Sequence, residues 1–294
     1  MSLLYRIVEN ACFILNRLPG PGPKDIMMSG FKKNDDSEKL PRYVYKRDME
    51  IRTVEVKGHL LHKISLKGSR NKKAVFFLPG GGGLARATRL HYMSAIALAR
   101  DSGNDIIIAE YPLAPKSNVI EALDWLMDAH AHLLSKYAAN DITFMGDSAG
   151  ANLILSLTGH LEDTKKPGRL IVISPACGLE NGKPRDIRLQ MEAKDPILSV
   201  AMNDIIAETW ARDVDLKSPD ISPEYIDYKD FPPMTIFYGE HELFYPHVED
   251  WLSGLKAQGV ELETFRKPMC HDWPLCYFFA EGREAVREMC RLIK

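Results

Sequence analysis

The sequence predicts an α/β protein with a mostly parallel sheet of eight strands flanked by helices. Short continuous apolar runs bounded by glycine or proline are typical of strands buried on both faces of a parallel sheet. Such runs recur at 74–79, 105–111, 141–146, 169–175 and 234–239, and a further strand is expected at 260–265. Segments of helical periodicity lie between and after them, at 90–103, 118–137, 151–164 and 281–294. This alternation is the pattern of βαβ units.

The N-terminal part of the chain differs from this alternation. Two strands at 49–56 and 59–66 flank Lys57-Gly58, as in an antiparallel hairpin. Residues 3–18 carry apolar side chains at helical spacing, and the proline–glycine run 19–23 ends the pattern. We expect this helix to pack on its own domain, with a peripheral membrane contact as the alternative. Charged residues interrupt it and no cleavage motif follows, so it does not resemble a signal peptide.

One long connection interrupts the second half of the chain. About sixty residues separate the strand near 173 from the strand near 236, whereas such connections usually have about 2–6 residues. The segment includes a helical pattern at 195–213, so we expect a helical cap over the C-terminal edge of the sheet. The 294 residues are read as a single domain, 1–294, that includes this cap.

Composition excludes several classes of function. A formal net charge of −2 gives no electrostatic reason to bind nucleic acid. No apolar run reaches the roughly 18–20 residues of a membrane span, so no stable membrane insertion is expected. The five scattered cysteines form neither a zinc pattern nor a disulfide framework, which predicts a reducing, cytoplasmic compartment. The expected partner is a small molecule, and a homodimer formed through the closing helix is left open.

A candidate nucleophile lies in Gly146-Asp147-Ser148-Ala149-Gly150, which fits G-x-S-x-G between a predicted strand and a predicted helix. The glycines permit a sharp turn in which a Cβ would crowd the serine or its neighbours. The turn places Ser148 at a helix N-terminus, where backbone N–H groups favour developing negative charge. The alternative is a tight turn that only requires small residues.

A second glycine-rich segment, Pro79-Gly80-Gly81-Gly82-Gly83, directly follows a predicted strand. Unshielded N–H groups in such a loop can hold the oxyanion of a tetrahedral intermediate. A flexible loop and a phosphate cradle are the alternatives. No Lys-Ser/Thr follows the glycines, which disfavours phosphate-loop chemistry.

A serine nucleophile needs a base, and the base needs an acid to orient it. When the order along the chain is serine, acid, histidine, the base lies downstream of both. This order favours His271, which follows the last predicted strand, over His160, His241 and His247.

The acid is expected just after the penultimate strand. Glu242 lies on the loop three residues past the strand-ending Gly239, and we favour it over Glu240. Glu249 and Asp250 fall in the next predicted helix.

Together these segments resemble the hormone-sensitive-lipase-like branch of the α/β-hydrolase fold (bacterial family IV), which includes many carboxylesterases. The resemblance covers about residues 70–294. It rests on PGGGG at 79–83, EYPLAP at 110–115, GDSAGANL at 146–153, GEHEL at 239–243 and HDW at 271–273. It implies an α/β-hydrolase fold with a helical cap contributed by about 1–45 and about 178–230.

The resemblance also implies roles for single residues. The oxyanion donors would be the N–H groups of Gly81, Gly82 and Ala149, and Asp147 would help to fix the turn around the serine. The acid is Glu where the family often has Asp. Three positions depart from the family pattern without removing a catalytic group: Pro79 replaces a histidine that braces the oxyanion loop, Pro112 replaces an arginine, and Ala151 replaces a common glycine.

The resulting expectation is a serine carboxylesterase with the triad Ser148, His271 and Glu242 and an acyl-enzyme intermediate. No metal or organic cofactor is required. A cap of this size favours a small, partly apolar pocket and short-chain acyl groups over an oil–water interface. The alternatives are an arylformamidase or amide hydrolase with the same triad, and a non-catalytic small-molecule receptor of the same fold.

Overall fold

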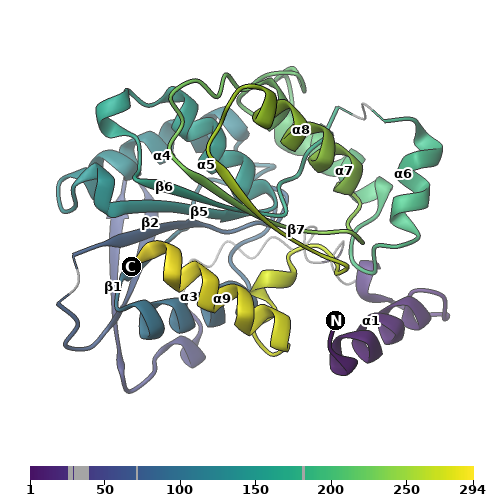
Figure 1. Cartoon of the computed structure of the whole chain (residues 1–294), viewed down its shortest axis with the longest axis horizontal. Helices are drawn as coiled ribbons and strands as arrows, with labels where there is room; N and C mark the ends of the chain where they lie inside the picture. Colours follow the sequence, from purple (N-terminus) through teal and green to yellow (C-terminus); the bar gives the residue numbers. More distant parts are fainter. Residues whose placement is uncertain (26–28, 30–39, 71, 181–182) are drawn as a thin grey trace.

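A computed structural model of the chain describes residues 1–25, 29, 40–70, 72–180 and 183–294. Its strands form one eight-stranded sheet in the order β1-β2-β4-β3-β5-β6-β7-β8 (Figure 1). β2 pairs antiparallel with β1 and β4, and all other neighbours are parallel. The strands are β1 (Met49–Val56), β2 (His59–Leu66), β3 (Ala74–Leu78), β4 (Asp105–Ala109), β5 (Ile142–Asp147), β6 (Arg169–Ile173), β7 (Met234–Gly239) and β8 (Leu262–Lys267). The predicted fold class is therefore confirmed.

The central strands are buried on both faces, as their continuous apolar runs predict. Every residue of β3, β5 and β7 is buried. Successive side chains of a strand point to opposite faces. Accordingly, Phe76 belongs to the apolar core on one side of the sheet and Phe77 to the core on the other.

Helices cover both faces of the sheet (Figure 1). α4 (Val119–Leu134), α5 (Ala149–His160) and α8 (Tyr245–Ala257) pack on one face. α3 (Arg89–Ser102) and α9 (Ala280–Ile293) pack on the other, against each other as well as the sheet. The parallel strands all end at the same edge, so the loops that follow β3, β5, β6, β7 and β8 meet there.

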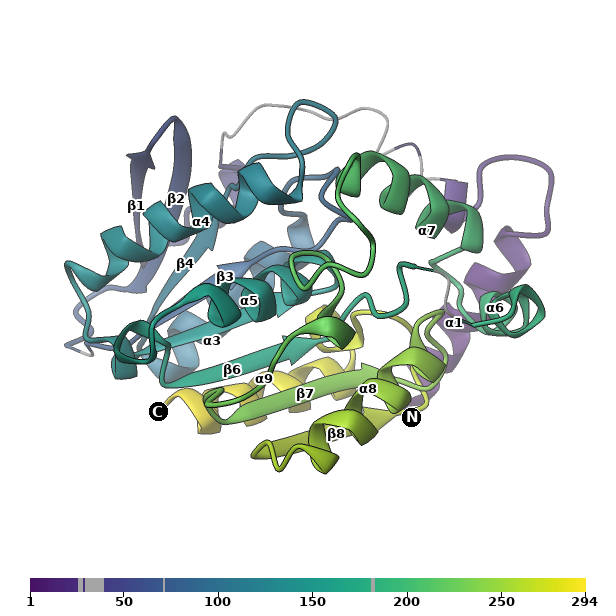
Figure 2. The same cartoon turned by 90° about the horizontal axis from the view of Figure 1, so that it is seen from above.

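The long segment between β6 and β7 lies beyond this edge, as Figure 2 shows. It contains α6 (Arg185–Glu192) and α7 (Val200–Ile206), which continues into a π-helical turn (Ala207–Ala211). The single helix predicted at 195–213 begins later than expected. Asp195 instead forms a turn in which its carboxylate accepts the N–H groups of Ile197 and Leu198, and Ser199 caps α7.

α1 (Leu3–Leu15) packs on the domain, as the sequence predicts. The apolar side chains that define its periodicity are not the ones that it buries. Tyr5 and Glu9 face inward, whereas Leu4, Ile7 and Ile14 are 52%, 57% and 59% exposed. The reason is that the inward residues are polar and find polar partners on the loops at the edge of the sheet. Of the N-terminal cap segment expected at about 1–45, residues 26–28 and 30–39 lie outside the described residues.

Candidate active site

Ser148 lies at the turn between β5 and α5, with the strained backbone angles φ 51° and ψ −122°. Only a crowded, well-packed turn holds a non-glycine residue in such a conformation. A Cβ on Gly146 would overlap the carbonyl of Gly150, and one on Gly150 would overlap the carbonyl of Leu78. The spacing of G-x-S-x-G is thus imposed by backbone contacts on both sides of the serine.

The glycine loop after β3 lies beside this turn. Gly81 and Gly82 have φ values of 116° and 64°, which side chains with a Cβ rarely adopt. Among the described residues, no hydrogen-bond acceptor is found for the N–H groups of Gly81, Gly82 or Ala149. Three backbone donors therefore remain available near the serine.

Three contacts brace this region, and sequence reasoning missed all of them. The hydroxyl of Tyr111 donates to the carbonyl of Pro79 over 2.6 Å, and Arg86 donates to the carbonyl of Tyr111. The glycine loop thus has a brace, although Pro79 replaces the histidine expected to brace it. On the other side, Nε2 of His91, at the start of α3, lies 3.0 Å from a carboxylate oxygen of Asp147.

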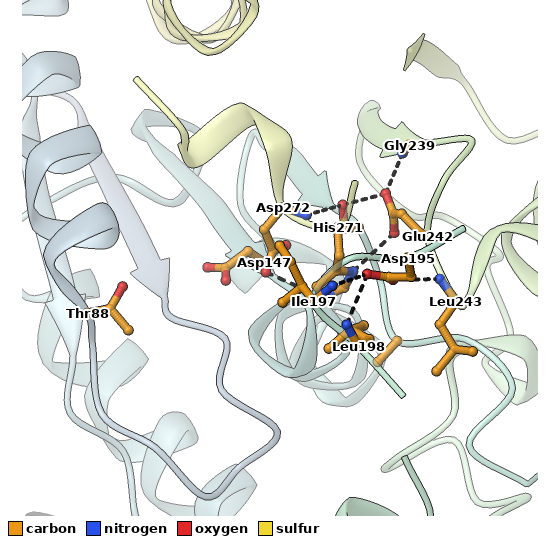
Figure 3. Close-up of polar contacts among 12 residues, drawn as sticks. Thr88, Asp147, Asp195, Ile197, Leu198, Gly239, Glu242, Leu243, His271 and Asp272 are labelled. Atoms are coloured by element: carbon orange, nitrogen blue, oxygen red, sulfur yellow. Dashed lines mark hydrogen bonds and ion pairs between the residues drawn. The ribbon is translucent and has the colours of Figure 1, made fainter. Parts of the chain in front are cut away.

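His271 and Glu242 are brought together from the loops after β8 and β7. Nδ1 of His271 lies 3.1 Å from Oε2 of Glu242, and both side chains are buried (Figure 3). The other carboxylate oxygen, Oε1, accepts the backbone N–H of Gly239 and the hydroxyl of Ser174. Glu240 instead points to the surface, where it pairs with Arg266.

Ser174 is a further residue that the sequence did not single out. It has a left-handed backbone, with φ 43°, just after β6. Its hydroxyl donates to Glu242 over 2.8 Å and accepts the backbone N–H of Asp272 over 3.1 Å. The Ser174 hydroxyl thereby links the loop that carries Glu242 to the loop that carries His271. The only signal in the sequence is that Ser174 follows a predicted buried strand.

A second carboxylate faces the other nitrogen of the imidazole. Nε2 of His271 lies 3.3 Å from Oδ2 of Asp272 and has no hydrogen-bond partner among the described residues. Burial lowers the pKa of His271, but the carboxylates of Asp272, Glu242 and Asp195 outweigh this effect and raise that pKa to about 10. Burial also raises the pKa of the Asp272 carboxyl. The two groups compete for one proton, and we assign it to the imidazole because Glu242 stabilises the imidazolium from the other side.

Asp195 connects the segment after β6 to the acid loop. Its buried carboxylate accepts three backbone N–H groups, those of Ile197, Leu198 and Leu243 (Figure 3). Leu243 directly follows Glu242, so this contact helps to fix the position of Glu242. Burial raises the pKa of Asp195 despite the opposing effect of His271 and of the three N–H groups.

Ser148 and His271 line one cavity together with Gly81, Gly82 and Ala149. The rest of the lining is largely apolar, with Asn152, Ser199, Asn203 and Asp220 as its further polar members. The apolar lining comes from α5 and from the segment after β6, and it includes Leu153, Leu179, Leu198, Met202, Ile206 and Trp210. The predicted serine, histidine and oxyanion residues therefore converge on one space, and Glu242 contacts the histidine from behind.

Comparison with known proteins identifies the family. Residues 75–275 match a family model described as the α/β-hydrolase fold. The chain belongs to this family. The resemblance inferred from the glycine loop and the G-x-S-x-G motif is thus confirmed.

Curated relatives are named for ester hydrolysis. An "Esterase" of Acinetobacter venetianus is 28% identical over 199 residues, which cover 66% of this chain and 65% of that protein. A "Carboxylesterase/phospholipase LipF" of Mycobacterium tuberculosis is 33% identical over 116 residues, or 39% of this chain and 31% of that protein. The chain therefore spans less than two thirds of these two relatives. An "Acetyl-hydrolase" of Streptomyces hygroscopicus is 25% identical, with 78% of each chain covered.

Solved structures share the fold over almost the whole chain. An esterase from the bacterial hormone-sensitive lipase family has a TM-score of 0.83 at 21% identity, covering 100% of this chain and 98% of that one. An esterase/lipase from an uncultured bacterium has the same TM-score and coverage at 22% identity. This likeness extends to the N-terminal segment and to the insertion after β6.

Proposed function

We propose that the protein is a serine carboxylesterase with Ser148 as nucleophile, His271 as general base and Glu242 as the acid that orients the base. The observation that carries this proposal is the arrangement of His271, which contacts Glu242 through Nδ1 and shares a cavity with Ser148 on its other side. In its neutral form, an imidazole held in this way keeps its proton on Nδ1 and presents Nε2 for proton transfer. The names of the curated relatives support the same reaction class.

In the proposed mechanism, the oxygen of Ser148 forms a bond to the ester carbonyl carbon while its proton moves to Nε2 of His271. The resulting oxyanion accepts the N–H groups of Gly81, Gly82 and Ala149. Each such donor contributes about 3–4 kcal/mol of transition-state stabilisation in related chemistry. The bond to the alkoxy group then breaks, and the alcohol leaves with the proton from His271.

The acyl group now resides on Ser148 as an ester. A water molecule gives a proton to His271 and bonds to the acyl carbon. The serine–acyl bond breaks, the proton returns to the serine oxygen, and a carboxylic acid is released. Glu242 stabilises the imidazolium in both halves of the reaction.

The substrate class is proposed from the cavity. Its apolar lining between α5 and α7 favours an uncharged acyl group, and the insertion after β6 closes over it. We assign the cap to about 1–45 and about 178–230 and propose short-chain acyl esters. Four of the five free cysteines are buried, which supports a reducing, cytoplasmic location.

The test compares Ser148→Ala with Ser135→Ala, a matched change of an exposed serine at the end of α4. With p-nitrophenyl acetate, we expect Ser148→Ala to lose at least about 10³-fold in kcat/KM and Ser135→Ala to retain wild-type turnover. A fluorophosphonate should label the wild type and Ser135→Ala only. Full turnover by Ser148→Ala would refute the proposal.

A substrate panel separates the alternatives. Esters with acyl chains of two to eight carbons are compared with an aryl formamide under the same conditions. A higher kcat/KM for the formamide would assign the triad to amide hydrolysis instead. Binding of ester analogues with neither turnover nor phosphonate labelling would indicate a receptor.

A further inference from the structure

The outward face of α1 is the largest run of exposed apolar side chains on any one described helix. It extends along the whole length of α1, and Leu18, in the turn between the helix and the proline–glycine run, adds to it. Its large members are Leu3, Leu4, Ile7, Val8, Ile14, Leu15 and Leu18, which are 75%, 52%, 57%, 37%, 59%, 50% and 54% exposed. Scattered surface leucines are ordinary, but a contiguous apolar patch marks a contact with something outside the molecule.

Helical geometry makes this face continuous. At about 100° per residue, these side chains and Ala11 fill an arc of roughly 140° without a polar interruption. Arg6 and Asn10 follow at one border of the arc, and Arg17 lies in the turn just past the end of the helix. The only acidic residue of α1 is Glu9, which is turned inward. The exposed side of the helix therefore combines an apolar face with positive charge and no negative charge.

The inward side holds α1 rigidly against the candidate active site. The hydroxyl of Tyr5 donates to Glu9 and accepts the backbone N–H of Cys270, the residue before His271. Glu9 also contacts Nδ1 of His241 over 2.9 Å, and His241 immediately precedes Glu242. The exposed apolar face is thus fixed in position by polar bonds to both catalytic loops.

The same helix borders the segment that covers the cavity. The side-chain amide of Asn16 donates to the carbonyl of Pro196, and Lys24 donates to the carbonyl of Glu192. Leu198 and Ser199, two and three residues past Pro196, line the cavity. Figures 1 and 2 both place α1 and α6 at the same end of the molecule.

We propose that α1 is an interfacial helix that docks the enzyme on an anionic phospholipid surface. A helix with an apolar arc and flanking arginines lies in the headgroup region with its apolar side buried and its cations among the phosphates. No described helix is long and apolar enough to cross a membrane, and this contact does not require one. This inference rests on the proposed function. The docked enzyme hydrolyses esters that partition into the lipid layer, and the cavity still sets the length of the acyl group.

A second copy of the chain fits this face less well. In an antiparallel pair of α1 helices related by a two-fold axis, the arginine borders of both helices fall on the same side. Each Arg6 then approaches the Arg17 of the other copy. No acidic side chain on the exposed side of the helix compensates this like-charge contact, whereas lipid phosphates would.

The experiment measures co-flotation of the full chain with vesicles of phosphatidylcholine alone or mixed with phosphatidylglycerol. We expect the wild type to bind the mixed vesicles and to bind neutral vesicles more weakly. Ile7→Glu/Ile14→Glu should weaken partitioning by at least about tenfold. Arg6→Gln/Arg17→Gln should remove the preference for anionic lipid. Met127→Glu, which places one charge on an exposed apolar position of α4, should bind like the wild type.

Three outcomes overturn the proposal. The first is that the wild type floats with neither vesicle, and the second is that Ile7→Glu/Ile14→Glu floats as well as the wild type. The third is that light scattering shows a dimer of the wild type that Ile7→Glu/Ile14→Glu dissociates, which would assign the face to a second copy. Hydrolysis of p-nitrophenyl acetate without vesicles should be equal in the wild type and this variant. If the wild type itself does not hydrolyse p-nitrophenyl acetate, the proposed function is refuted and the lipid contact is not.

Discussion

Replacing Asp272 with asparagine should shift the pH dependence of catalysis to lower pH. The imidazole of His271 lies between Glu242 and Asp272, and its pKa is raised to about 10. A base must be unprotonated to accept the serine proton, and at pH 7.5 only about 0.3% of such an imidazole is neutral. Asparagine tolerates the left-handed backbone of this position, with φ 56°, as well as aspartate does.

The size of the shift follows from the distance. Two unit charges 3.3 Å apart interact with about 1 kcal/mol at the dielectric constant of water and about 5 kcal/mol at an effective value of 20. Loss of the Asp272 charge should therefore lower the pKa of His271 by about 1 to 3.5 pH units. The Asp272 side chain is 23% exposed, which argues for the lower half of this range. A fall of two pH units would make the neutral imidazole about 75-fold more abundant at pH 7.5.

The assay is kcat/KM for p-nitrophenyl acetate from pH 5 to 10.5, because this ratio reports the pKa of the base in the free enzyme. The acidic limb should move down by about one pH unit or more in Asp272→Asn. Asp220→Asn removes another carboxylate that lines the cavity but pairs with His160 instead, and its limb should stay in place. An acidic limb of Asp272→Asn that is unchanged or moves upward would refute the reasoning.

Stability should respond to the same charge. The folded pKa of His271 is raised above its ordinary value of 6.5. Its ion pairs therefore contribute stability that is complete below about pH 6.5 and is lost as the pH rises through about 10. Urea unfolding of the wild type should show the free energy of unfolding falling across this window. The fall should be complete at lower pH in Asp272→Asn.

Two further substitutions have matched controls in the chain. Glu242→Gln should reduce kcat by about 10³–10⁴-fold, since the imidazole loses its anionic partner. Glu240→Gln, whose carboxylate pairs with Arg266 at the surface, should change kcat by less than about threefold. A larger loss of kcat in Glu240→Gln than in Glu242→Gln would make Glu240 the acid. Gly150→Ala, whose Cβ would overlap the carbonyl of Leu78, should lower the free energy of unfolding by about 3 kcal/mol or more. Gly254→Ala, in open space on α8, should raise it by about 0.5–1 kcal/mol; comparable melting of both glycine variants would contradict the packing argument.

The sheet and the main parts of the site could be predicted because their signals are local. A strand buried on both faces needs an uninterrupted apolar run, which β3, β5 and β7 show in the sequence. The turn at Ser148 needs glycines at fixed positions because backbone carbonyls fill the space around it. The chain order then restricts the candidate base to a few histidines.

Other features depend on residues that meet only in the folded chain. Ser174 joins the acid and histidine loops, and Asp195 holds Leu243, yet neither lies in a motif. Tyr111 braces Pro79 across 32 residues of sequence. No local sequence pattern predicts which carboxylate a buried hydroxyl contacts, so only the structure reveals these hydrogen bonds.

The orientation of α1 could not be predicted for a related reason. Periodicity shows that apolar residues share one face, and the usual inference is that this face is buried. A helix instead buries the face that has partners. Tyr5 and Glu9 find the N–H of Cys270 and the ring of His241 at the sheet edge, where parallel strands end and polar loop groups gather. At such an edge a polar helix face can be the inward one, and the apolar face is then left for a partner outside the chain.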